Sequence, residues 1–294
     1  MKTALHTISY AGVWPGQAAL SLSEIIRRAA DLGYDGLMIA AKRPHLSVLD
    51  TDEEALQRLR GELDAAGLGV ACLAGYNNFS ADADHPDIPI SEMQIAHIER
   101  LAQMTAALGG RIVRVFTAYQ HPALSEGVLR QRVVASLKES ARRAADHGCV
   151  LAVQNHHDFA AHWQTLRDVL LEVDEPNCRA GFDAWAPTLH GDDIVAAARE
   201  MAPLMAQTVV ADYVLRPRFK YAPQLVDYEP QLPLVQAVAM GEGMTDYRGF
   251  LNALTDGGYD GYVTYEMCSP LLGGGSLANL DAYARKFLEF MQTL

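Results

Sequence analysis

Short apolar runs alternate with longer amphipathic segments along the whole chain, about eight times in all. The amphipathic segments space their apolar residues as a helix does, and the apolar runs are typical of buried strands. This alternation predicts parallel strands joined by crossover helices. We expect strands within 4–12, 37–40, 69–76, 111–119, 150–158, 178–187, 206–214 and 261–270, and helices within 21–36, 51–68, 91–110, 128–148, 162–177, 191–203, 246–261 and 276–294.

Several predicted helices carry recognisable end signals. Either Ser21 or Ser23 is placed to cap the first helix, and Gly33 stands where that helix would stop. Glu53 and Glu54 fall in the first turn of the next helix, where acidic groups meet the positive end of the helix dipole. The alternation therefore reflects real helices between the strands.

The number of repeated units distinguishes between two parallel-sheet folds. Eight strands with eight helices is the count of a closed barrel, whereas an open doubly wound sheet usually has fewer strands. The first strand also lacks the Gly-rich phosphate turn that such open sheets often carry. We therefore predict an α/β fold, a (β/α)8 TIM barrel, formed by residues 1–294 as one domain without a linker.

Composition narrows the classes of partner. A formal net charge of -12 disfavours an extended nucleic-acid footprint but leaves room for a local basic pocket that binds a small anion. The 4 cysteines form no C-x-x-C pair, which favours reduced thiols. No apolar run approaches membrane-spanning length, and the N-terminal segment lacks a signal-peptide core. We expect a cytoplasmic protein with a small-molecule substrate and no nucleic-acid or membrane partner.

Four predicted strands in the second half end in a polar or acidic residue. In a barrel, all these ends open onto one face, so residues far apart in sequence can converge there. Their amide and carboxylate oxygens are hard ligands that suit Mg²⁺ or Mn²⁺ better than Zn²⁺. The candidate metal ligands are Gln154, Asp183, Asp212 and Glu266.

Three sequence blocks carry a resemblance to a known family. They are AADLGYDG near the start, AALGGRIVRV in the middle and GEGMTDYRGFLNALTDGGYDGYVTYE near the end. Through them the chain resembles the xylose isomerase-like barrel superfamily of sugar phosphate isomerases and epimerases, which also includes inosose dehydratases and hydroxypyruvate isomerases. In the last block, the resemblance implies that Glu266, at the end of its strand, binds a divalent metal.

The other ligand positions of that superfamily are altered in this chain. Its fifth strand usually ends Glu-Asn-His, with the Glu as metal ligand and acid/base, and here that Glu is replaced by Gln154. Its sixth strand carries Asp-x-x-His, and here Asp183 is present but Ala186 stands at the His position. Its seventh reads His-x-x-Asp, and here Val209 precedes Asp212. The resemblance thus implies two matched ligands out of four.

The altered ligands change the expected chemistry. An amide cannot exchange a proton near neutral pH, so Gln154 can coordinate a metal but cannot be a general base. Glu266 or His156 then becomes the catalytic base. The resemblance implies a metal-dependent sugar isomerase or epimerase that abstracts a proton next to a carbonyl of a keto-sugar, sugar phosphate or cyclitol. A site with only one catalytic base would also suit a dehydratase or another lyase.

The segment 214–238 is too long for a minimal connection, and barrels place such insertions over the active face. Arg216 and Lys220 are therefore candidate substrate-binding residues, or only solubilising charges. Asp212 could instead pair with one of these basic residues. Trp185 could stack on a sugar or merely pack, and His6, like Arg114, could line the barrel mouth or be a satisfied interior group. The candidate substrate-binding residues are Arg216, Lys220, Trp185 and His6.

Two other function classes stay open. A catalytically silent barrel, serving as a binding or accessory subunit, would also show altered ligands. A DNA-repair nuclease of the same superfamily would need a histidine cluster for zinc and a basic groove, and the sequence supplies neither. The superfamily often forms homo-oligomers, so a homo-oligomer is possible here too, although no residue pattern specifies an interface.

Overall fold

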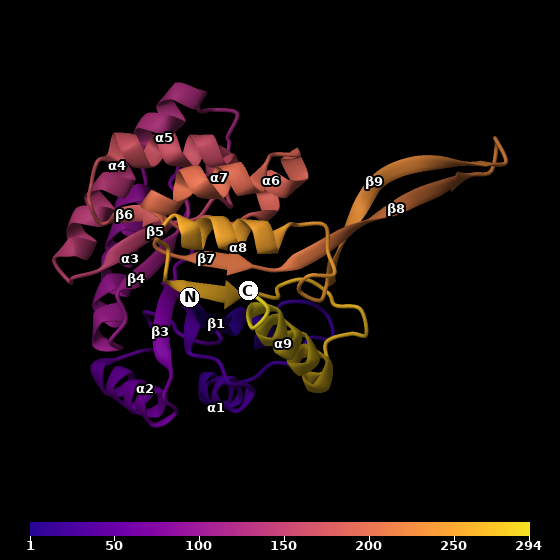
Figure 1. Ribbon diagram of the computed structural model, residues 1–294. Coiled ribbons are helices and arrows are strands. Elements are labelled where there is room, and N and C mark those ends of the chain that lie inside the picture. Colours follow the sequence, from indigo (N-terminus) through magenta and orange to yellow (C-terminus); the bar gives the residue numbers. More distant parts are fainter.

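The computed structural model describes residues 1–294 and confirms the predicted barrel. Eight parallel strands form one curled sheet in the order β6-β5-β4-β3-β2-β1-β10-β7 (Figure 1). These strands are β1 (Lys2–His6), β2 (Gly36–Ala40), β3 (Gly69–Ala74), β4 (Ile112–Val115), β5 (Val150–Val153), β6 (Cys178–Ala180), β7 (Thr208–Val210) and β10 (Tyr262–Tyr265).

The two edge strands, β6 and β7, meet to close the sheet. A parallel bridge joins Ala180 to Met205, and the backbone nitrogens of Ala206 and Gln207 both donate to the carbonyl oxygen of Ala180. The Thr208 hydroxyl donates to the Phe182 carbonyl at 2.8 Å. Closure through these few bonds brings the carboxyl ends of all eight strands to one face, which is where a barrel builds its site.

The helices pack around the outside of the sheet (Figure 1). Ser21, rather than Ser23, caps α1 in a reciprocal capping box with Glu24, and Gly33 ends it in the left-handed conformation at φ 95°. A short helix, α6, was not predicted and follows β6 directly. The helices are α1 (Leu22–Leu32), α2 (Glu53–Ala65), α3 (Ile90–Ala107), α4 (Glu126–Ala145), α5 (Trp163–Val173), α6 (Trp185–His190), α7 (Ile194–Met201), α8 (Tyr247–Asp256) and α9 (Leu277–Met291), with 3-10 turns at Thr7–Tyr10, Asp158–Ala160 and Ala202–Leu204.

The core has an outer and an inner part. A cluster of 68 buried residues, running in sequence from Leu5 to Phe287, fills the space around the sheet. A separate small cluster on the barrel strands consists of Met38, Cys72, Ala74 and Val209. This apolar filling makes the barrel a packed core rather than a pore, so polar chemistry is confined to its open face. No helix is both long and apolar enough to cross a membrane.

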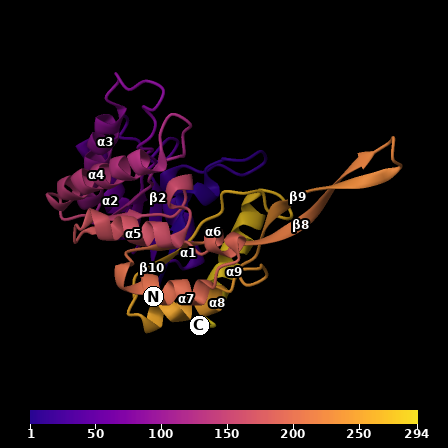
Figure 2. The ribbon, with the colours of Figure 1, turned by 90° about the horizontal axis from the view of Figure 1, so that it is seen from above.

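The segment expected to be a loop over the active face is instead a regular hairpin. Strands β8 (Asp212–Ala222) and β9 (Asp227–Val238) pair antiparallel over ten residue pairs. In both views the hairpin extends away from the barrel as an arm (Figures 1 and 2). The prediction that this insertion folds over the barrel mouth was wrong, because cross-strand pairing satisfies its backbone without support from the barrel.

Candidate active site

Two adjoining cavities open at the carboxyl ends of the strands. The larger has a volume of about 470 Å³ and the smaller about 220 Å³. Both are lined by the same four residues, which come from the ends of β5 and β10: Gln154, His156, Glu266 and Cys268. Residues more than a hundred positions apart in sequence therefore share one wall, as the strand-end pattern predicts.

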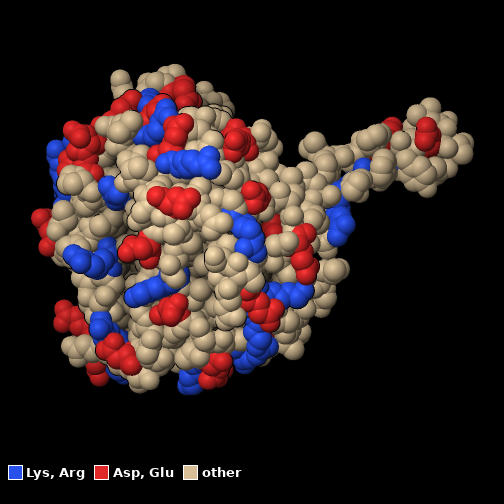
Figure 3. Space-filling view, viewed as in Figure 1, with Lys and Arg blue, Asp and Glu red and all other residues tan.

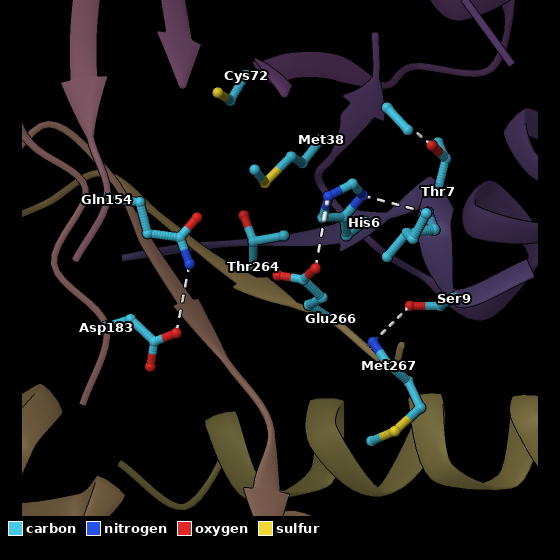
Figure 4. Close-up of polar contacts among 12 residues, drawn as sticks. His6, Thr7, Ser9, Met38, Cys72, Gln154, Asp183, Thr264, Glu266 and Met267 are labelled. Atoms are coloured by element: carbon cyan, nitrogen blue, oxygen red, sulfur yellow. Dashed lines mark hydrogen bonds and ion pairs between the residues drawn. The ribbon is translucent and has the colours of Figure 1, made fainter. Parts of the chain in front are cut away.

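Glu266 lies directly after β10, where its backbone nitrogen donates to the Val210 carbonyl at 3.1 Å. Its carboxylate lies 3.8 Å from Nε2 of His6, which is longer than a hydrogen bond, and its side chain keeps 22% exposure (Figure 4). Burial raises the pKa of Glu266 to about 7, and the nearby Arg114 only partly opposes that shift. A carboxyl group whose pKa lies near neutrality can both take and give a proton.

His6 lies beneath Glu266 at the end of β1 and is fully buried. Its Nδ1 accepts a hydrogen bond from the Ile8 backbone nitrogen at 3.2 Å, so the ring proton of the neutral form sits on Nε2. Burial holds the pKa of His6 well below its ordinary value, which keeps the ring neutral. His6 lines neither cavity, and its Nε2–H faces the Glu266 carboxylate instead. The structure therefore places His6 behind the predicted base rather than against a substrate.

Asp183 and Gln154 lie side by side across the β5–β6 boundary. The amide nitrogen of Gln154 donates to Asp183 Oδ2 at 3.3 Å (Figure 4). The backbone nitrogen of Trp185 donates to Oδ1 of the same carboxylate at 2.8 Å. Burial raises the pKa of Asp183 to about 6. Asn155 holds the Asp183 backbone through two hydrogen bonds, of 2.7 and 2.8 Å, and sequence reasoning gave it no role. The only feature of the sequence that could have indicated a role for Asn155 is its position between Gln154 and His156.

Part of the predicted ligand set lines one cavity. Asp183, Glu266 and Gln154 all line the smaller cavity, and both carboxyl groups have pKa values raised by burial, as expected where negative charge lacks a compensating cation. Val209 occupies a wall of that cavity and offers no ligand atom. Asp183 and Glu266 offer carboxylate oxygens, whereas Gln154 turns its amide nitrogen toward Asp183, and oxygen ligands suit Mg²⁺ or Mn²⁺ better than Zn²⁺.

Asp212 is not brought to either cavity. Its carboxylate accepts hydrogen bonds from the backbone nitrogens of Gly241 at 3.0 Å, Gly243 at 2.9 Å and Tyr213 at 3.0 Å. A Cβ on Gly243 would lie only 1.9 Å from Asp212 Oδ1, which explains why this turn needs glycine. The carboxylate thus anchors the base of the arm. It makes neither the metal contact nor the ion pair considered from the sequence.

His156 and Trp185 do reach the cavities. His156 lines both, with its ring 4.7 Å from that of Phe116 between centroids. His156 keeps an exposed surface, and partial desolvation together with the positive charge of Arg114 lowers its pKa to about 4, so its imidazole is neutral at pH 7. Trp185 lines the smaller cavity and packs 4.5 Å from the ring of Tyr213. A half-buried aromatic ring at a cavity wall is suited to contact a sugar.

The arm carries Arg216 and Lys220 away from the site. Arg216 Nε donates to Gln236 Oε1 across the hairpin at 2.9 Å, and Lys220 pairs with Glu229 in the strand register. Both side chains are exposed, and neither lines a cavity. Substrate binding by these two residues within one chain is therefore not supported, because the insertion forms a self-contained ribbon.

Two other cations line the larger cavity. Arg114, on β4, is 3% exposed, and its Nε and Nη1 atoms have no hydrogen-bond partner. Its guanidinium lies 3.9 Å from the centre of the Phe116 ring, and the ammonium of Lys42 lies 3.8 Å over the ring of Tyr76. A buried arginine with unpaired donors requires an acceptor. In the sequence, the buried guanidinium of Arg114 is indicated by an arginine inside the otherwise apolar strand RIVRV.

A separate group of potential metal ligands lies outside both cavities. The ligand atoms of His162, His190 and Asp192 lie within 4.8 Å of one another, at the start of α5 and the end of α6. None of the predicted ligands belongs to this group. The metal site expected from the sequence and this cluster are therefore distinct places on the molecule.

The fold and the cavity together define a TIM-barrel protein with a polar site at the carboxyl ends of its strands. The family model described as xylose isomerase-like TIM barrel matches residues 26–294. The chain belongs to this family, which confirms the resemblance seen in the sequence.

Known proteins similar to the chain include a curated epimerase and two solved structures. The 2-epi-5-epi-valiolone 7-phosphate 2-epimerase of Actinoplanes sp. (strain ATCC 31044 / CBS 674.73 / SE50/110) is 27% identical over 198 residues, covering 67% of this chain and 70% of the relative. A D-psicose 3-epimerase crystallised in the presence of D-fructose superposes with a TM-score of 0.76 at 18% identity, covering 100% and 99% of the two chains. The probable 3-DHS dehydratase involved in petrobactin synthesis from Bacillus anthracis gives 0.75 at 18% identity, with 99% of each covered.

Proposed function

We propose that this protein is an isomerase or epimerase that abstracts a proton next to a carbonyl of a polyhydroxylated, anionic substrate. The observation that carries the proposal is the Glu266 carboxyl group, which lines both cavities and has a pKa of about 7. The curated relatives are epimerases, including one that acts on a sugar-like phosphate, and they support the same class of reaction. The cluster of 68 buried residues, which runs in sequence from Leu5 to Phe287, supports residues 1–294 acting as a single domain.

Asp183 and Glu266 would hold the divalent cation, together with the amide oxygen of Gln154 after rotation of that amide. When bound, Mn²⁺ or Mg²⁺ polarises a carbonyl and stabilises the negative charge that develops on its oxygen. His6 presents its Nε2–H to the Glu266 carboxylate from 3.8 Å, so it would orient that carboxylate if the two side chains closed to hydrogen-bond distance. His156, as a neutral imidazole on the shared wall, is placed to assist a hydroxyl or carbonyl oxygen by hydrogen bonding.

Arg114 and Lys42 define the substrate class. Two buried guanidinium donors without partners, next to a lysine, suit a phosphate or carboxylate group. This is the local basic pocket for a small anion that the net charge of -12 left open. Both cations and Glu266 line one cavity, so an anionic group held by Arg114 would leave the rest of the substrate beside the base.

The test is solvent deuterium exchange into ketoses, ketose phosphates and cyclitol phosphates, followed by magnetic resonance with added Mn²⁺. We expect exchange at a carbon next to the carbonyl with wild type and a loss of roughly a hundredfold or more with Glu266→Gln. Glu242→Gln is the matched control, because Glu242 lies on the surface in an ion pair with Lys286. Full exchange in the Glu266 variant would refute this assignment of the base.

The same assay examines the anion subsite through Arg114→Met. We expect KM for a phosphorylated substrate to rise strongly while KM for its unphosphorylated counterpart changes little. Equal effects on both substrates would exclude an anion-binding role for Arg114.

A catalytically silent barrel is the second candidate. The observation that favours it is the Gln154–Asp183 hydrogen bond, which occupies an oxygen that a metal would need. A silent barrel should hold no stoichiometric divalent ion and exchange no substrate proton. Elemental analysis of the purified protein, together with the exchange assay, distinguishes the two.

A further inference from the structure

The β8–β9 arm separates apolar from polar residues onto its two faces. Paired residues in an antiparallel hairpin point to the same face, and successive residues alternate. The pairs Leu215 with Val235, Phe219 with Pro230, and Tyr221 with Tyr228 fall on one face. The intervening pairs fall on the other face and carry charged and amide side chains, as with Lys220 and Glu229, and Arg218 and Gln231, while Leu234, opposite Arg216 and next to the register shift between Arg216 and Arg218, is apolar. The arm is therefore an amphipathic ribbon.

The apolar face has no partner within the chain. Phe219 is 61% exposed, Tyr221 49% and Tyr228 63%. At roughly 200 Å² per aromatic side chain, these three residues alone present about 350 Å² to solvent, as much as the largest apolar patch of many monomers. Both ribbon views show the arm clear of every other element, and few charged groups cover it in the space-filling view (Figures 1, 2 and 3).

This face is continuous with the candidate active site. At its base, Tyr213 and Val235 line the smaller cavity, and Tyr213 contacts Trp185. Ala237 forms a parallel bridge with Leu271, in the loop that follows β10. The apolar strip therefore begins at the barrel mouth and runs outward from it.

The barrel mouth carries further exposed apolar side chains. Val13 and Tyr119 line the larger cavity and are 44% and 45% exposed, and Leu272, in the loop after β10, is 61% exposed. We call these three residues the apolar rim. The chain's own arm projects away from the barrel (Figure 2). One chain thus carries an uncovered apolar arm and an uncovered apolar rim.

We propose that the arm docks on a second copy of this chain, with its apolar face seated on the partner's apolar rim and the exchange repeated about a two-fold axis. Such an isologous arrangement uses both surfaces twice and leaves neither exposed. The rim adds roughly 250 Å² to the roughly 350 Å² of the arm, so one arm and one rim per chain come to roughly 600 Å², the lower bound of what a stable interface buries on each partner. The docked arm also covers the mouth of the partner's cavity. This inference concerns assembly and does not depend on the reaction proposed above.

The test is the oligomeric state of the purified protein, measured by light scattering and sedimentation over a range of concentrations. We expect a dimer for wild type and at least a tenfold larger dimer dissociation constant for Phe219→Asp. Gln231→Asp is the matched control, because it places the same charge on the polar face of the arm and should leave the dimer intact. A monomeric wild type at tens of micromolar, or an unchanged dimer in Phe219→Asp, would overturn the proposal.

A shortened arm provides a second variant that does not add a buried charge. Replacing residues 217–233 by Asn-Gly joins Arg216 to Leu234, which are already paired, through a two-residue turn. We expect a folded monomer with the thermal unfolding profile of a single barrel. Hydrogen-exchange protection at Tyr119 in the wild-type dimer, lost in this variant, would support the rim as the docking surface. Protection confined to the arm would contradict it.

Discussion

Replacing Glu266 by Gln should stabilise the metal-free protein, and the gain should depend on pH. The substitution keeps the shape of the side chain but removes its charge. Burial raises the pKa of Glu266 from 4.5 to about 7, so the folded protein favours the protonated carboxyl and resists its ionisation. Ionising Glu266 inside the folded protein lowers the free energy of unfolding. A residue that destabilises the fold in this way is expected at a functional site, where its charge serves function rather than stability.

The size and direction of the effect follow from proton linkage. Below pH 4.5 the carboxyl is protonated in both the folded and unfolded states, and wild type and variant should unfold with similar free energies. Between pH 4.5 and about 7 the unfolded state ionises first, so wild type loses stability relative to the variant. Above this window the difference should level off at no more than about 3 kcal/mol.

The assay is urea unfolding of both proteins in chelator at pH 4.5, 6 and 8, because these values span the window. We expect the variant's advantage to grow with pH, and added Mn²⁺ to narrow it by stabilising wild type more strongly. An advantage that is independent of pH would show that Glu266 ionises normally in the folded protein. If the variant's advantage depends on pH but Mn²⁺ does not change it, Glu266 is a buried carboxyl with a raised pKa that does not bind the metal.

Two further substitutions test other parts of the site. Gln154→Glu adds a third carboxylate beside Asp183, so titration calorimetry should show at least about tenfold tighter Mn²⁺ binding, and unchanged or weaker binding would remove Gln154 from the ligand set. Gly243→Ala drives a Cβ into Asp212 and should lower the free energy of unfolding by about 1–3 kcal/mol. Gly61→Ala, at an open position in α2, is its control, and equal stability of the two variants would show that the Asp212 cradle is not constrained.

The sequence by itself determined the barrel and the edge at which its site lies. Strands and helices alternate with the correct periods, and parallel strands must present their carboxyl ends on one face. Glu266, Asp183, Gln154 and His156 follow directly from that rule, since each stands at or just beyond a strand end. The family blocks strengthened the same reading, because they occupy helix-to-strand joints that the fold requires.

Only the tertiary structure decided what the other candidates contact. Asp212 also lies just beyond a barrel strand, β7, but its carboxylate accepts hydrogen bonds from backbone nitrogens of a turn about thirty residues further along the chain, a contact that no local pattern encodes. Arg114 became a cavity cation because a packed barrel left its donors unpaired.

The arm shows the same limit of sequence reasoning most clearly. Its alternation was present in the sequence, but Pro217, Pro230 and Pro233 favoured an irregular loop. A two-stranded ribbon tolerates proline wherever the missing N–H would face solvent. Whether this segment forms a ribbon therefore depends on the register in which β8 and β9 pair. The direction in which it leaves the barrel depends on the anchoring of Asp212 and on long-range packing at its base. Local propensity and periodicity therefore predicted which elements form, whereas contacts between distant residues fixed which side chains meet.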